Sequence, residues 1–202
     1  SFPTRRSSDL AALVNNRPDL IEKSSNSLIL IVRDSDNKLY SSVRRSYGRE
    51  FFGDWCEEAG INRDYSIYHY PQLDARALAK LWVQNYFFFN TDENGMAIRD
   101  WYTTPIASPI YTSLGQYSKN QEEKGLSKTT NSTDSLSLGY RTESKAGWIV
   151  EGRYRASTDG GIIYPDDSAP YIISIVSDIP SDLSQLEPLC LELSSIYKKT
   201  ID

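Results

Sequence analysis

Two short motifs in this chain carry side chains that could act on one acyl group. Ser35-Asp36-Asn37 offers a hydroxyl and an amide, and Lys145-Ala146-Gly147-Trp148 offers an ammonium group and backbone N–H donors. A segment typical of a β-strand, 158–164, follows the second motif. A hydroxyl, a cation and N–H donors that converge on one carbonyl are the groups that acyl transfer needs. We therefore expect both motifs to face a shared cleft.

Each motif also has an ordinary structural interpretation. Ser-Asp-Asn makes common helix caps and turns, because short polar side chains bind free backbone N–H groups. A lysine near a glycine is usually a solvated strand position. The order of the motifs along the chain, their separation and their structural contexts together favour the chemical interpretation.

From about Pro18 to its end, the chain resembles the class A β-lactamase-like serine hydrolases, within the β-lactamase and penicillin-binding protein superfamily. That family has a Ser-x-x-Lys helix, a Ser-Asp-Asn loop and a Lys-Thr-Gly strand, followed by a strand hairpin and a carboxy-terminal helix. The last two motifs match Ser35-Asp36-Asn37 and Lys145-Ala146-Gly147, and no upstream residue looks like the nucleophilic serine. The resemblance implies an α+β fold with an antiparallel sheet packed against helices, incomplete at the amino terminus.

The resemblance also implies roles for single residues. Ser35 would relay a proton to the leaving nitrogen of the substrate, and Asn37 would bind the acylamino carbonyl. Lys145 would assist proton transfer through Ser35 and attract the substrate carboxylate. The backbone N–H of Trp148 would form part of the oxyanion hole.

The remaining expected substrate contacts lie on the lysine strand. Gly147 would let the substrate approach the strand edge closely. Ala146 stands where the family usually has Thr or Ser, so one hydroxyl that binds the substrate carboxylate is missing, and Ser144 is the neighbouring hydroxyl. We expect Ser144, Ala146 and Gly147, together with Asn37, to bind substrate.

A second departure from the family concerns the step that releases the acyl group. The stretch 60–73 has no Glu-x-x-Leu-Asn, the signature that holds the deacylating water, and Asp64 and Asp74 are its nearest carboxylates. Asp74 is also well placed to cap a helix. The full-length protein is therefore expected to be acylated by β-lactams or D-Ala-D-Ala-like peptides and to hydrolyse β-lactams slowly. The alternative is a non-catalytic relative that binds cell-wall ligands.

The first ten residues, SFPTRRSSDL, read like the translation of a common DNA-sequencing adapter. We therefore interpret 1–10 as an assembly artefact and 11–202 as the carboxy-terminal part of a single serine hydrolase domain. Without a Ser-x-x-Lys segment, this fragment is expected to be inactive. A secreted or envelope location is implied by the family alone.

Composition narrows the class of protein further. The 202 residues are 39% hydrophobic with a net charge of −5, and no basic patch is interleaved with aromatic residues, so nucleic acid is not an expected partner. No long apolar run predicts a membrane span. His69 is the only histidine, which excludes a multi-histidine zinc site, and we expect no metal or cofactor. Cys56 and Cys190 lie in apolar helical patterns, and their spacing leaves a disulfide open.

Periodicity predicts the elements that position these residues. Helices are expected from Asn37 to a stop at Gly48, over 51–59 with a left-handed cap at Gly60, and after a cap at Asp74. Three antiparallel strands are expected over 136–150, 157–164 and 171–178, after an exposed loop at 116–134. A final helical face runs over 183–197, where Pro188 predicts a kink or a late start.

Overall fold

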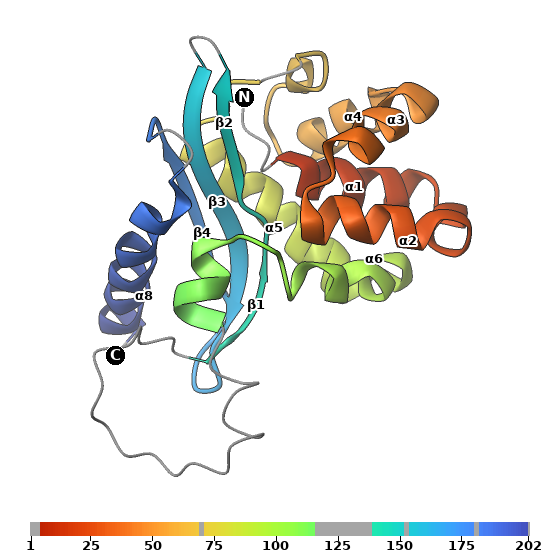
Figure 1. Ribbon diagram of the computed structural model, residues 1–202. Coiled ribbons are helices and arrows are strands. Elements are labelled where there is room, and N and C mark those ends of the chain that lie inside the picture. The colour runs from red at the N-terminus through yellow and green to blue at the C-terminus, as the bar shows by residue number, and fades with distance from the viewer. Residues whose placement is uncertain (1–4, 69–70, 116–138, 152–153, 180–181, 202) are drawn as a thin grey trace.

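The computed structural model describes residues 5–68, 71–115, 139–151, 154–179 and 182–201. An antiparallel sheet lies between a large helical layer and the carboxy-terminal helix, beside which the short helical segment 111–115 packs (Figure 1). The predicted α+β class with a sheet packed against helices is confirmed. The predicted loop at 116–134 lies outside the described residues.

Among the described residues, six α-helices that precede the sheet in the chain build the helical layer. Their bounds are α1 Arg5–Asn16, α2 Asp19–Asp34, α3 Asn37–Tyr47, α4 Glu50–Glu58, α5 Ala75–Thr91 and α6 Glu93–Ile98. Short 3-10 helices η1 Arg63–Ser66 and η2 Arg99–Tyr102 and the π-helix η3 Tyr111–Gly115 connect this layer to the sheet.

The sequence signals for the helix ends are confirmed. Gly48, directly after α3, and Gly60, the second residue after α4, both have positive φ, at 78° and 66°. The Asp74 carboxylate accepts the Ala77 backbone N–H at 2.7 Å and so caps α5.

The sheet contains β1 Arg141–Ser144, β2 Gly147–Glu151, β3 Tyr154–Tyr164 and β4 Tyr171–Ser177. The long strand β3 pairs with β4 along one edge, and β2 and β1 follow one another along the other edge. The predicted meander is therefore confirmed, but the expected first strand is interrupted at Lys145-Ala146. Lys145 keeps one ladder bond, since its backbone N–H donates to Gly160 O at 2.9 Å.

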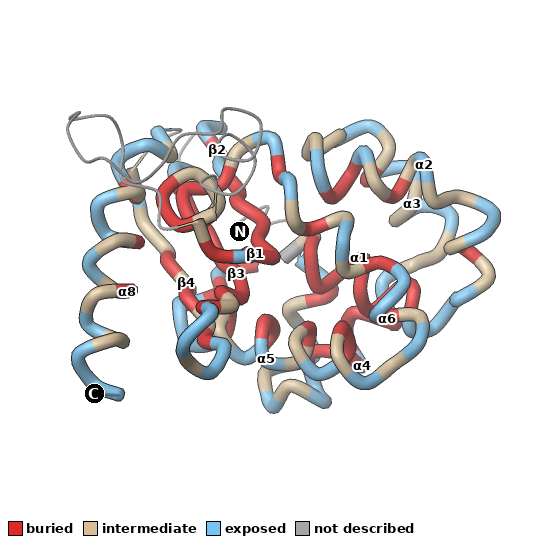
Figure 2. The backbone as a smooth tube through the Cα atoms, turned by 90° about the horizontal axis from the view of Figure 1, so that it is seen from below, coloured by how far each residue is buried: buried red, intermediate tan, exposed pale blue. Residues whose placement is uncertain are grey.

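Two hydrophobic clusters lie on the two faces of the sheet. The larger one joins α1, α2, α4 and α5 to the sheet through Ile162, and the smaller one joins Ile163 and Ile173 to the carboxy-terminal helix α8 Glu187–Ile201. Buried residues accordingly gather in α1 and the central strands, while the outer side of α8 is exposed (Figure 2). Cys56 lies in the first cluster and Cys190 in the second, and the two cysteines do not form a disulfide.

The terminal helix starts late, as Pro188 predicts. A 3-10 turn, η4 Leu183–Leu186, precedes α8, and Pro188 lies in the first turn of α8, where its missing N–H costs no helical hydrogen bond.

Residues 5–10, which we excluded from the expected fold, form the first half of α1. Ser7 and Ser8 are fully buried, Tyr102 Oη donates to the Ser7 carbonyl at 2.9 Å, and Asp9 pairs with Arg44 at 2.7 Å. This placement does not bear on the origin of the segment, so the adapter interpretation stays a prediction. Leaving the segment out of the expected fold nevertheless missed half of a central helix.

Candidate functional site

The Ser-Asp-Asn motif forms the tight connection between α2 and α3. Ser35 is the C-cap of α2 in the left-handed conformation, with φ 59° and ψ 34°, and its N–H donates to Leu30 O. Asp36 caps α3, because its carboxylate accepts the N–H groups of Lys38 and Leu39 at 2.8 and 2.9 Å. Asn37 is then the first residue of α3, exposed beside Ser35.

Lys145 reaches this connection from the interruption between β1 and β2. The Lys145 side chain is buried, and its ammonium group donates to Ser35 Oγ and, at 3.1 Å, to the Ala146 carbonyl. The fold therefore brings together two predicted site residues that are 110 positions apart in the sequence.

A small cavity of about 70 Å³ opens at the same place, lined by Arg6, Ser35, Asn37 and Trp148. The Arg6 guanidinium donates to the Ser35 carbonyl at 3.3 Å and lies over the Tyr40 ring. Trp148 is 37% exposed on β2. Arg6 was not predicted as a site residue, because we left residues 1–10 out of the expected fold.

The other predicted substrate contacts lie beneath this cavity. Gly147 pairs with Thr158 on β3, whose hydroxyl donates to the Gly147 carbonyl at 3.1 Å. Ala146 is fully buried. Ser144 is also fully buried, and its Oγ lies 2.9 Å from Ser108 Oγ, so this hydroxyl faces the interior. Ser144 does not line the cavity, so its role as the substrate-binding hydroxyl stays a prediction.

A carboxyl group that the sequence analysis missed lies behind Lys145. Asp159 on β3 is fully buried and accepts hydrogen bonds from Ser108 Oγ at 2.7 Å and from the N–H groups of Ile110 and Gly160, both at 2.9 Å. An aspartate inside a strand of small and apolar residues is the signal that could have indicated it, since charged residues are rarely buried without partners.

Burial controls the protonation of both groups. Burial, and then the nearby Arg6 charge, lower the pKa of Lys145 to about 7, against the opposing effect of the Asp159 and Asp34 charges. Burial raises the pKa of Asp159 to about 7, and its three hydrogen bonds and the Lys145 charge oppose the rise. In each group desolvation outweighs the attraction between them, so both change charge near neutral pH.

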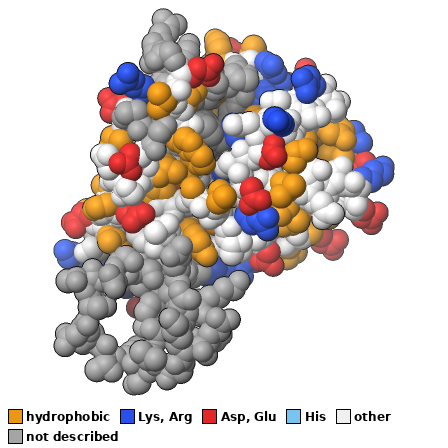
Figure 3. Space-filling model, viewed as in Figure 1, with side chains coloured by type: hydrophobic (Ala, Val, Ile, Leu, Met, Phe, Trp, Pro, Cys, Tyr) orange, Lys and Arg blue, Asp and Glu red, His pale blue; other side chains and the backbone are white. Residues whose placement is uncertain are grey.

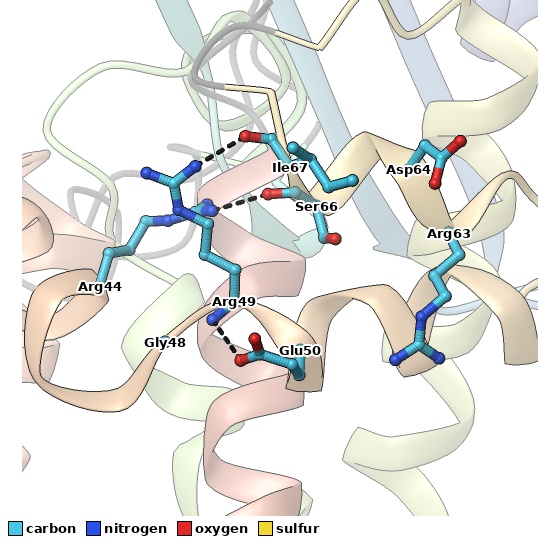
Figure 4. Close-up of a pocket in the computed structure, with 8 residues that line it drawn as sticks. All are labelled: Arg44, Gly48, Arg49, Glu50, Arg63, Asp64, Ser66 and Ile67. Carbon is cyan, nitrogen blue, oxygen red and sulfur yellow. Dashed lines mark hydrogen bonds between the residues drawn. The ribbon is translucent and has the colours of Figure 1, made fainter.

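A larger hollow of about 480 Å³ lies between α3, α4 and η1 (Figure 4). Its arginines are already engaged: Arg44 and Arg49 donate to the carbonyls of Ser66 and Ile67 at 2.9 and 2.7 Å, and Arg63 pairs with Asp54 and Glu57. Asp64, one of the two carboxylates considered for deacylation, lines this hollow and not the cavity at Ser35. We therefore place the candidate site at the smaller cavity, which Ser35, Asn37 and Trp148 line.

The surface around these hollows has no single charge sign. Figure 3 shows acidic and basic side chains side by side over the helical part of the molecule. Within the described ranges, no group of three His, Cys, Asp or Glu side chains is arranged to hold a metal ion. No described helix has the long apolar stretch that crossing a bilayer requires.

Comparison with known proteins gives structural matches only. No family model and no curated protein matches the sequence. The class A β-lactamase reconstructed for the last common ancestor of Gram-negative bacteria shares 14% identity, with 100% of this chain and 84% of that chain covered and a TM-score of 0.64. A mutant of PBP-A, solved as its acyl-enzyme complex with penicillin G, shares 15% identity over 98% of this chain and 82% of that chain, with a TM-score of 0.64.

A further variant of the ancestral class A β-lactamase, bound to 5(6)-nitrobenzotriazole, shares 12% identity with a TM-score of 0.54. The alignment covers 87% of this chain but only 63% of that variant. The chain thus spans less than two thirds of the length of this structural relative. Together these matches establish the fold, which is that of class A β-lactamases and PBP-A.

Proposed function

We propose that the Ser35 cavity is part of the active site of a serine hydrolase of the β-lactamase and penicillin-binding superfamily. In the whole protein, a Ser-x-x-Lys serine would be acylated by β-lactams or D-Ala-D-Ala-like peptides. The observation that carries this proposal is the hydrogen bond from the Lys145 ammonium group to Ser35 Oγ, beside a cavity that Asn37 and Trp148 line. The fold shared with PBP-A, which penicillin G acylates in its solved complex, supports it.

Proton transfer is the role that the geometry supports best for Ser35 and Lys145. A lysine with a pKa of about 7 gives and takes protons readily at neutral pH, and Ser35 Oγ is in direct contact with it. The pair would carry a proton to the leaving nitrogen of the substrate. When protonated, Lys145 would also attract the substrate carboxylate.

Asn37 and Trp148 would hold the substrate in this proposal. The exposed Asn37 amide would bind the acylamino carbonyl of the substrate, and the Trp148 backbone N–H would stabilise the oxyanion. Because Gly147 has no side chain, it would leave room for the substrate along β2. No metal or cofactor takes part in these steps.

Release of the acyl group is expected to be slow. The cavity lining contains no carboxylate among the described residues, and Asp74 is occupied as the cap of α5. Without a carboxylate that activates water, the acyl-enzyme would persist, as in a penicillin-binding protein. This favours acylation by β-lactams over efficient β-lactam hydrolysis.

A non-catalytic ligand-binding relative is the second candidate. Ala146 at the family's hydroxyl position and the inward-facing Ser144 favour it, because both weaken the grip on a substrate carboxylate. A cell-wall peptide would then be bound but not cleaved. A secreted or envelope location is part of both proposals and rests on the resemblance alone.

The test is to read the native gene upstream of Ala11, express the extended protein and expose it to a fluorescent penicillin. Covalent labelling that Ser35→Ala slows and Ser41→Ala, on the exposed side of α3, leaves unchanged would support the enzyme. Reversible binding without covalent labelling would support the second candidate. An upstream sequence without Ser-x-x-Lys would refute the catalytic proposal.

A further inference from the structure

Ser35 has features of a nucleophile as well as those of a proton relay. Its hydroxyl lines an open cavity, contacts the amine of Lys145, and sits on a backbone with positive φ between two helices. Ser35 is the only non-glycine residue with positive φ in the described part of the chain. Serine nucleophiles commonly sit on strained turns that push the hydroxyl out of the surrounding structure.

We propose that Ser35 and Lys145 form a serine–lysine dyad in which Ser35 itself attacks small activated esters, so that the chain is acylated without a Ser-x-x-Lys segment. This activity goes beyond the proposed function, where Ser35 only relays a proton. The new activity is also independent of the proposed function, because it needs only residues that this chain contains.

The chemical step requires Lys145 as a neutral base. The Lys145 amine takes the Ser35 hydroxyl proton while Oγ forms a bond to the carbonyl carbon of the ester. The tetrahedral oxyanion then collapses, the bond to the leaving alkoxide or aryloxide breaks, and Lys145 returns its proton to that leaving group. Water would later hydrolyse the seryl ester and restore the hydroxyl.

The surroundings of Lys145 favour the neutral amine. Four charged or polar residues from three elements face it: Arg6 on α1, Asp34 and Ser35 at the end of α2, and Asp159 on β3. Burial and the Arg6 charge lower its pKa to about 7, so a large fraction of Lys145 is neutral at pH 7 to 8. Asp159 and Asp34 act in the opposite direction and would stabilise the ammonium group formed during the attack.

The cavity also indicates which ester can react. A space of about 70 Å³ is enough for a short acyl group. The Asn37 amide and the Arg6 guanidinium line the same space as Ser35 and can donate hydrogen bonds to the oxyanion. Acetyl esters with good leaving groups are therefore the expected substrates.

The experiment treats the chain with p-nitrophenyl acetate between pH 5 and 9 and locates acetyl groups by peptide mass spectrometry. The result expected is an ester on Ser35, cleaved by hydroxylamine, whose formation rate rises with a midpoint near pH 7. Lys145→Arg keeps the positive charge but cannot act as a base, so it should slow Ser35 acetylation by about 10²-fold or more. Ser35→Ala should abolish the adduct, and Ser41→Ala should leave it unchanged.

Several results would overturn the proposal. One is acetylation of Ser35 no faster than that of the exposed Ser41, and another is a hydroxylamine-resistant amide on Lys145 in place of the seryl ester. If Lys145→Arg does not fold, the pH profile of the unmodified chain decides, because a flat profile would exclude a base of this pKa. None of these measurements uses penicillin, so this proposal and the proposed function can fail separately.

Discussion

The backbone strain at Ser35 can be measured by comparing Ser35→Gly with Ser35→Ala. Both variants lose the hydroxyl and its contact with Lys145, so the difference between them isolates the backbone. Ser35 has φ 59° and ψ 34°, a conformation that costs an L-residue about 1–2 kcal/mol. Glycine avoids this cost but loses about 0.5–1 kcal/mol of unfolded-state entropy. Ser35→Gly should therefore be more stable than Ser35→Ala by about 0.5–1 kcal/mol.

Urea unfolding of the two variants, analysed at a common m-value, gives this difference directly. The same pair of substitutions at Ser41 provides the control, because Ser41 lies inside α3, where glycine is about 1 kcal/mol less stable than alanine. The sign of the difference should therefore reverse between the two positions. If alanine is the more stable residue at both positions, the backbone of Ser35 is not strained, and strain is no longer an argument that Ser35 has a functional role.

Three other predictions follow from the site. Gly161→Ala would place its methyl group 2.6 Å from Ser144 Cβ and 2.8 Å from the Glu143 carbonyl oxygen. We therefore expect the free energy of unfolding, measured with urea, to fall by about 1–3 kcal/mol and β1 to be displaced. An unchanged stability would show that the strands are not this close. NMR titration of the lysine side chains should give Lys145 a pKa near 7. This pKa should rise in Arg6→Ala, which removes a repelling charge, and fall in Asp159→Asn, which removes an attracting charge. Shifts of equal sign in the two variants would contradict the proposed electrostatics. The raised pKa of Asp159, about 7, makes the stability of the protein depend on pH, because the folded state holds this proton more tightly than the unfolded state. The stabilising contribution of Asp159 is complete below its unfolded pKa and is lost as pH rises through 7. Asp159→Asn should therefore flatten the fall in the free energy of unfolding between pH 4 and 7, and an unaltered slope would assign that fall to other groups.

Local signals in the sequence predict much of this fold. The caps at Asp36 and Asp74, the glycines after α3 and α4, and the alternation in β3 and β4 act through neighbouring residues, so a short window of sequence contains them. Pro188 likewise predicts where α8 can begin. The position of Lys145 in an interruption between two strands was not predicted, because the pairing of β1 and β2 with β3 determines it.

The candidate site was predictable in part. The motif spacing indicated Ser35, Asn37 and Lys145, but whether they meet depends on contacts across 110 residues. Asp159 and Ser108 were missed because their role appears only when three segments pack together, although the aspartate inside an apolar strand was a local signal. The direction of the Ser144 side chain also follows from the register of β1 on β3, which the sequence alone does not specify.

The central claim is that Asn37 and Trp148 line one ligand site, which Lys145 contacts through Ser35. Titration of the labelled chain with penicillin G tests it most directly. The account predicts that the first NMR signals to shift are the amides of Asn37, Gly147 and Trp148 and the side chain of Lys145, and that Lys145→Ala abolishes these shifts. Shifts confined to the hollow near Arg44 and Arg49, or none at millimolar penicillin, would contradict it.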